Sequence, residues 1–191
     1  MGTPREWKRL RTGEVTDYRI LRIREDVVGD PRGGVERPRA IIEAPDWVHI
    51  IPVTLSDEVV LVRQFRFGIW SNSLEIPGGV VEAGEDPKAA AVRELEEETG
   101  YVPGRVLALG AIHPNPAILT NTCHTFLALG CEKTGQIDPD ADEDIQLVLE
   151  PRRRIPELIS TRAITHALVL CAFLLERLWW ERQTSYEPER P

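Results

Sequence analysis

The residues best suited to chemistry lie in the stretch GGVVEAGEDPKAAAVRELEEETGY, residues 78–101. At about 100° per residue, Glu94, Glu97 and Glu98 share one side of the helix expected over about Pro87 to Thr99. Like charges one turn apart destabilise a helix by roughly 0.2–0.5 kcal/mol, and carboxylates near its C-terminus oppose the helix dipole. A divalent cation offsets both effects, because Mg²⁺ binds through carboxylate oxygens. These residues alone leave two interpretations open, a solvated helix face or a metal site.

Short signals on either side of these acids define the helix that must position them. Asp86 is an N-cap residue, and Pro87 suits the first helical position. Gly100 is a typical residue just after a helix C-terminus. Arg93 lies one turn before Glu97 and could hold that carboxylate in orientation. The glycine pair before the helix favours the metal interpretation, because glycine lets a backbone carbonyl approach a ligand closely.

The spacing of these residues resembles a known family signature. The matching positions, with U for a bulky aliphatic residue, follow G-x5-E-x7-R-E-U-x-E-E-x-G-U: Gly79, Glu85, Arg93-Glu94-Leu95, Glu97-Glu98, Gly100 and Tyr101. This resembles the signature of the Nudix hydrolases, in which an aliphatic residue is commoner at the place of Tyr101. The resemblance implies an α/β/α sandwich and metal ligation by Glu94, Glu97 and Glu98. It gives Arg93 and Glu97 catalytic roles, with Glu85 in support.

The flanking stretch VRQFRFGIWSNSLEIPGGVVEAGE is similar to the ADP-ribose and nucleoside diphosphate sugar pyrophosphatase branch of that family. The likeness implies that the carbonyl of Gly78 is a further metal ligand. It also implies that Arg66 and Glu75 contribute to substrate binding or to a dimer contact. The resemblance therefore implies hydrolysis of a pyrophosphate bond with Mg²⁺, or Mn²⁺ as the alternative, giving a nucleoside monophosphate and a sugar phosphate.

Two loops would then decide the substrate and supply the base. In HPNPAILTNTC, Pro116 (or Pro114) matches a proline of the branch, and Asn115 is a candidate for reading sugar hydroxyls. The rest of that loop departs from the best-known ADP-ribose enzymes. In DPDADED the resemblance makes Glu143 the general base, with Asp142 and Asp144 as competitors.

The chain is expected to form a fold of the α+β class, a Nudix α/β/α sandwich with a mixed sheet. Residues 46–191 should form the hydrolase domain, from strand patterns such as VHIIPVTL, EVVLVRQFRF and HTFLALGCEK and a last helix over Thr161 to Arg182. Residues 1–45, with strands expected at Thr16–Ile23 and Arg39–Ile42, are too polar to make a core alone. They should form a small β-sheet that contributes to a homodimer.

Composition excludes several classes of function. The net charge of −8 argues against nucleic-acid binding, which requires a basic face. No apolar run is long enough to cross a membrane, and the start lacks a signal peptide. Three widely spaced cysteines are typical of reduced thiols, so a cytoplasmic protein is expected. Two alternatives to a nucleotide-sugar hydrolase stay open: a hydrolase of dinucleoside polyphosphates or modified nucleoside triphosphates, and a non-catalytic sensor of nucleotide sugars.

Overall fold

The computed structural model describes residues 2–135 and 144–185. The chain divides into two compact units. One unit comprises Met1–Asp46 and His113–Thr122, and the other comprises Trp47–Ile112 and Cys123–Pro191. The loop at residues 113–122 thus joins the N-terminal segment, a grouping that the sequence did not indicate.

The first unit is a four-stranded antiparallel sheet in which β3 pairs with each of the other strands. Its strands are β1 (Lys8–Arg11), β2 (Val15–Asp17), β3 (Arg22–Gly29) and β4 (Glu36–Glu43). Arg24 and Asp26 are buried and paired with each other, and Arg24 also pairs with Glu43. The loop at 113–122 attaches through Ile42, whose amide donates to the carbonyl of Ile118 at 2.8 Å. Ion pairs thus take the place of much of an apolar core in this unit.

The strand predicted at Thr16–Ile23 is wrong in its extent, because the chain turns in its middle. β2 ends at Asp17 and β3 begins at Arg22. Arg19 adopts a φ of 69°, and its amide donates to Asp17 Oδ1 at 2.7 Å. An Asp side chain that accepts from the backbone two residues later stabilises such a turn without glycine. The turn also carries Tyr18 and Ile20, whose side chains gave the segment a strand-like composition.

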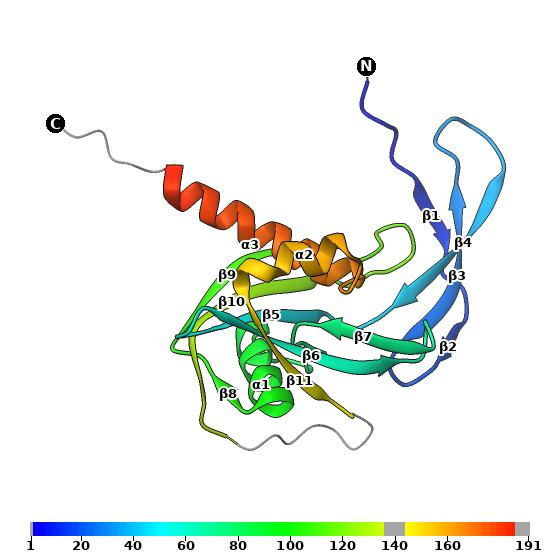
Figure 1. The fold of residues 1–191 in the computed structure, drawn as a ribbon. Helices are drawn as coiled ribbons and strands as arrows, with labels where there is room; N and C mark the ends of the chain where they lie inside the picture. The colour runs from blue at the N-terminus through cyan, green and yellow to red at the C-terminus, as the bar shows by residue number, and fades with distance from the viewer. Residues whose placement is uncertain (1, 136–143, 186–191) are drawn as a thin grey trace. The chain divides into compact units, whose positions relative to one another are not determined.

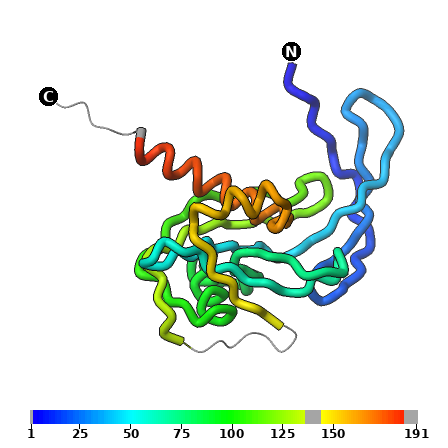
Figure 2. The backbone as a smooth tube through the Cα atoms, viewed as in Figure 1, coloured from blue at the N-terminus to red at the C-terminus, as the bar shows by residue number. Residues whose placement is uncertain are grey.

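The second unit contains a seven-stranded mixed sheet (Figure 1). Its order is β11-β6-β5-β10-β8, with β7 also paired to β6 and β9 to β10. The strands are β5 (Trp47–Thr54), β6 (Glu58–Arg66), β7 (Ser71–Glu75), β8 (Tyr101–Val102), β9 (Arg105–Ile112), β10 (Cys123–Lys133) and β11 (Gln146–Pro151). β5 and β10 are far apart in sequence but run parallel and side by side, as the backbone trace shows (Figure 2). The predicted mixed sheet is confirmed.

Helices cover both faces of this sheet (Figure 1). Along β5, Ile50 packs with α1 (Pro87–Thr99), and Ile51 packs with α2 (Ile155–Ser160) and α3 (Ala167–Ser185). Successive strand residues point to opposite faces, so one strand serves both cores. The result is three layers, α/β/α.

α1 has the bounds predicted from sequence, because both of its ends are fixed locally. Asp86 Oδ1 accepts from the amides of Lys88 and Ala89 at 3.0 and 3.1 Å. Gly100 takes a φ of 70° and donates its amide to Glu96. The last helix starts later than predicted, since Arg162 turns the chain at a φ of 63° between α2 and α3.

Candidate active site

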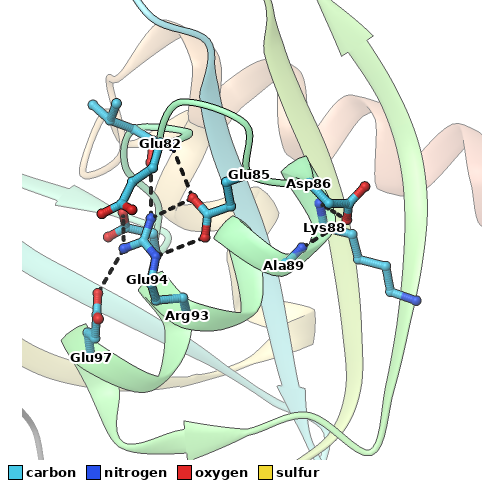
Figure 3. A network of polar contacts seen from close by, with 9 residues as sticks. Glu82, Glu85, Asp86, Lys88, Ala89, Arg93, Glu94 and Glu97 are labelled. Carbon is cyan, nitrogen blue, oxygen red and sulfur yellow. Dashed lines mark hydrogen bonds and ion pairs between the residues drawn. The ribbon is translucent and has the colours of Figure 1, made fainter.

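Arg93 gathers three carboxylates at the loop before α1 and on the helix itself (Figure 3). Its Nε and Nη2 donate to Glu85 at 3.0 and 3.1 Å, and its Nη1 donates to Glu94 and Glu97, each at 2.9 Å. Nη2 also donates to the carbonyl of Val80 at 3.1 Å. The pKa of Arg93 is raised, first by its hydrogen bonds to Glu85, and those bonds lower the pKa of Glu85. Arg93 therefore fixes the glycine loop, the helix and the carboxylates relative to one another.

The glycine pair lets the loop backbone lie directly against the helix carboxylates. A Cβ on Gly79 would lie 2.4 Å from Cδ of Glu94. A Cβ on Gly78 would lie 2.2 Å from the carbonyl oxygen of Val48. The amide of Gly78 donates to Glu98 Oε2 at 3.2 Å. A side chain at position 78 would collide with the backbone of β5, whereas one at position 79 would displace the Glu94 carboxylate, so the close approach of loop and carboxylates depends on both glycines.

The solvent exposure of the three helix glutamates rises from Glu98 through Glu94 to Glu97. Glu98 is 1% exposed, whereas the side chains of Glu94 and Glu97 are 14% and 45% exposed. A solvated helix face would not bury a carboxylate to this extent, because burial of an ionised group requires a compensating partner. The gradient therefore favours a binding site over a solvated surface.

The donor chemistry of this set fits a hard divalent cation. Every candidate ligand offers oxygen, namely the carboxylates of Glu94, Glu97 and Glu98 and the carbonyl of Gly78, and Mg²⁺ prefers such ligands. The missing Cβ at Gly79 leaves Glu94 room against the loop. Among residues 2–135 and 144–185, no group of three or more His, Cys, Asp or Glu side chains is already arranged to hold a metal ion. Arg93 donates to Glu94 and Glu97 in this arrangement, so the guanidinium orients carboxylates that would hold a cation.

Arg66 and Glu75 form a second ion pair between β6 and β7. The guanidinium of Arg66 donates from Nε and Nη2 to the two oxygens of Glu75, at 3.0 and 2.7 Å. Glu75 is fully buried, whereas the Arg66 side chain is 41% exposed. Burial acts to raise the pKa of Glu75, but Arg66 outweighs it and the pKa lies below its ordinary value of 4.5. The buried carboxylate of Glu75 thus fixes the orientation of the partly exposed Arg66 guanidinium.

Sequence reasoning missed two histidines close to the glycine loop. His49 on β5 contacts Gly78, since a Cβ on that glycine would lie 2.5 Å from Cδ2 of His49. Its ring packs edge to face on His166, just before α3, with 5.7 Å between centroids. Burial, and secondly His166, hold the pKa of His49 down at about 4. A lone histidine in a strand pattern carries no signal of this, because its partner is more than a hundred residues away.

Of the other predicted site residues, two belong to the first unit and two lie outside the described residues. Asn115 and Pro116 are exposed and belong to the first unit, where the carbonyl of Asn115 accepts from Ile118 and Leu119. Glu143 and Asp142 lie outside the described residues. Asp144 is described and exposed, two residues before β11. The general base and the sugar-reading residues therefore stay predictions.

Known proteins resemble this chain over most of its length. A family model described as "NUDIX domain" matches residues 45–164, more than half of the chain. It is the family predicted from the glutamate spacing.

Two relatives and one solved structure extend the likeness. The "ADP-ribose pyrophosphatase" of Bacillus subtilis (strain 168) is 32% identical over 166 residues, 85% of this chain and 88% of that protein. The "Methanol dehydrogenase activator" of Bacillus methanolicus is 33% identical over 149 residues, 78% of this chain and 80% of that protein. A crystal structure of an "ADP compounds hydrolase" matches with a TM-score of 0.84 at 22% identity, covering 96% of this chain and 98% of that one. The structural likeness confirms the predicted fold class.

Proposed function

Because the chain belongs to the Nudix family, we propose that it hydrolyses the pyrophosphate bond of ADP-ribose or a related nucleoside diphosphate sugar with the help of a divalent metal. The observation that carries this proposal is the complete carboxylate set on α1, gathered by Arg93 against the glycine loop. Hydrolysis adds one water across the P–O–P bond and releases a nucleoside monophosphate and a sugar phosphate.

Each residue has a distinct task in this reaction. Glu94, Glu97, Glu98 and the carbonyl of Gly78 hold the cation, for which we propose Mg²⁺ because all these ligands are oxygens. When bound, the cation supplies neutralisation of the phosphates and a water of lowered pKa. Arg93 holds the carboxylates in place, since it donates to three of them.

Substrate contacts come from outside α1. Arg66 contributes a phosphate contact, oriented by Glu75, and a guanidinium is well suited to phosphate. Glu143, the general base in this proposal, removes a proton from the attacking water. Asn115 and Pro116 would contact the sugar.

The names of the relatives support the substrate class. The Bacillus subtilis relative is an ADP-ribose pyrophosphatase and covers most of the chain. A panel of ADP-ribose, GDP-mannose and UDP-glucose, assayed for phosphate-releasable product with Mg²⁺ or Mn²⁺, tests the proposal. We expect ADP-ribose to give the highest kcat/KM. Turnover confined to dinucleoside polyphosphates or nucleoside triphosphates would instead support the alternative hydrolase function.

A second candidate function is suggested by the other relative, which is named an activator of methanol dehydrogenase. A regulator that only binds nucleotide sugars could dispense with the ligand carboxylates, yet this chain retains all of them. Hydrolysis is therefore the function we assign, and absence of turnover with every compound of the panel would favour the sensor.

We also propose a homodimer and a cytoplasmic location. Exposed apolar surface can mark an interaction site, and the first unit exposes several large apolar side chains. They are Trp7, Leu10, Val15, Tyr18, Ile20 and Val35. Within the part of the chain that the structure describes, no helix is long and apolar enough to span a membrane. The three cysteines form no disulfide among the described residues, which agrees with a reducing compartment.

A further inference from the structure

His49, which lies against the glycine loop, and two residues beside it carry buried polar atoms. His49 Nδ1, Thr125 Oγ1 and His166 Nδ1 are shielded from solvent and have no hydrogen-bond partner among the residues that the structure describes. His49 and Thr125 are 7% and 1% exposed. Buried polar atoms in folded proteins are almost always hydrogen-bonded, either to protein or to ordered water. These atoms therefore call for a partner other than the described side chains.

The fold brings these three residues together from separate elements. His49 and Thr125 are register partners in the parallel pair β5–β10, so their side chains lie on the same face of the sheet. The ring of His166, just before α3, packs against the ring of His49. That face of the sheet is the one covered by α3.

The ring of His49 separates this polar site from the glycine loop. Its Cδ2 edge faces Gly78. Cδ2 and Nδ1 are the two ring atoms bonded to Cγ, and they lie on opposite edges of the imidazole. Because the Cδ2 edge faces Gly78, the Nδ1 edge faces away from the loop. The loop rests on β5 through two further contacts, because the amides of Gly79 and Val48 each donate to the other's carbonyl, at 3.1 and 2.9 Å. The orientation of the His49 ring thus limits how closely Gly78 approaches β5.

We propose that His49 is a positioning residue for the hydrolysis, and that an internal water bound by His49 Nδ1, His166 Nδ1 and Thr125 Oγ1 fixes its ring beneath Gly78. The proposal rests on the proposed function, in which the carbonyl of Gly78 binds the metal.

Water suits this place better than an ion. Two imidazole nitrogens and a hydroxyl supply both donors and acceptors, and an ordered water with two to four polar partners satisfies such a mixture. Arg66 and Glu75, which also act on the pKa of His49, are paired with each other.

Hydrogen exchange of the Gly78 and Gly79 amides in the metal-free full chain tests the proposal. Thr125→Val removes Oγ1 with almost no change of volume, and His49→Leu removes the ring nitrogens. His49→Asn keeps a polar group on Cγ. Ile51→Val is the matched control, because Ile51 lies two residues further on the same face of β5 and is also buried.

We expect Thr125→Val and His49→Leu to increase the exchange rates of the two amides by about tenfold or more, because a loosened ring would let the glycine loop open locally more often. His49→Asn and Ile51→Val should stay within about threefold of the wild type. With ADP-ribose and Mg²⁺, the first two variants should lower kcat by about tenfold and leave KM within about twofold, because positioning acts on the reacting geometry.

Exchange rates of Thr125→Val and His49→Leu that equal those of Ile51→Val would overturn the proposal, as would faster exchange with unchanged kcat. A crystal structure of the wild type at atomic resolution should show the water, and a dry site would also overturn it. Exchange needs no turnover, so a wild type that hydrolyses none of the panel would refute the proposed function separately.

Discussion

Gly79 shows how one missing side chain shapes the candidate site. A Cβ there would lie 2.4 Å from Cδ of Glu94, well inside van der Waals contact. We predict that Gly79→Ala displaces the Glu94 carboxylate, changes the free energy of unfolding little because that side chain can move, and lowers turnover more than tenfold. Steady-state kinetics and urea unfolding measure both effects. Gly68→Ala is the matched control, because a Cβ at Gly68 meets nothing within 4 Å; equal effects of the two variants would contradict the account.

Arg93 matters through the geometry of its guanidinium as well as its charge. It donates to Glu85, Glu94, Glu97 and the Val80 carbonyl at once, whereas a lysine ammonium is a point charge with three donors. We predict that Arg93→Lys lowers kcat by about 10²-fold, because carboxylates move out of position. The free energy of unfolding should fall by about 1–3 kcal/mol. Arg177→Lys, in an exposed pair with Glu181, should change neither quantity. Near-normal turnover of Arg93→Lys would mean that positive charge alone suffices.

At the scale of elements, the sequence predicted a helix or strand correctly where the residues that determine it lie close together in the chain. α1 was predicted with its observed bounds, because Asp86, Pro87 and Gly100 act within one turn of its ends. The glutamate spacing likewise lies within a single helix and identified the family. α2 was missed, since six residues are too few for a helical period to show.

Features made by distant residues could not be predicted. Nothing in the sequence near His49 indicates that Thr125 and His166 will lie beside it. The loop at 113–122 reads as a connection between strands, yet it pairs with Ile42 through backbone hydrogen bonds that carry no side-chain signature. Glu75 and Arg66 were both named as site residues, but their pairing depends on the register of β6 with β7.

The ion pair between β6 and β7 makes the second unit sensitive to acid. The folded pKa of Glu75 lies below its unfolded value, so its carboxylate stabilises the fold above about pH 4.5 and this contribution is lost as the pH falls through the folded pKa. Glu75→Gln should destabilise the protein by about 1–3 kcal/mol at pH 7, discounted because Arg66 is partly exposed.

Urea unfolding at several pH values measures this. The difference between Glu75→Gln and the wild type should shrink below pH 4.5. A difference that is constant from pH 7 to pH 3 would refute the assigned pKa direction.

At the scale of the whole molecule, the first unit has the exposed apolar surface that a partner would cover. We predict that the full chain is a dimer in solution and that Ile20→Lys, on the exposed turn after β2, shifts it toward monomer. A buried interface charge without a partner is strongly unfavourable, which is the reason for this expectation. Light scattering over a concentration series gives the mass. Leu174→Lys, an exposed substitution on α3, serves as control, and a monomeric wild type would contradict the prediction.

The most direct test of the account is the Mg²⁺-dependent hydrolysis of ADP-ribose by Glu98→Gln beside Glu96→Gln. Both residues lie on α1, but Glu98 is buried against Gly78, whereas Glu96 is exposed. Glutamine at 98 can still accept from the Gly78 amide, so folding should be preserved while the anionic ligand is lost. The account predicts that Glu98→Gln loses at least about 10²-fold in kcat/KM at saturating Mg²⁺ and that Glu96→Gln retains wild-type activity. Wild-type turnover by a folded Glu98→Gln would contradict it.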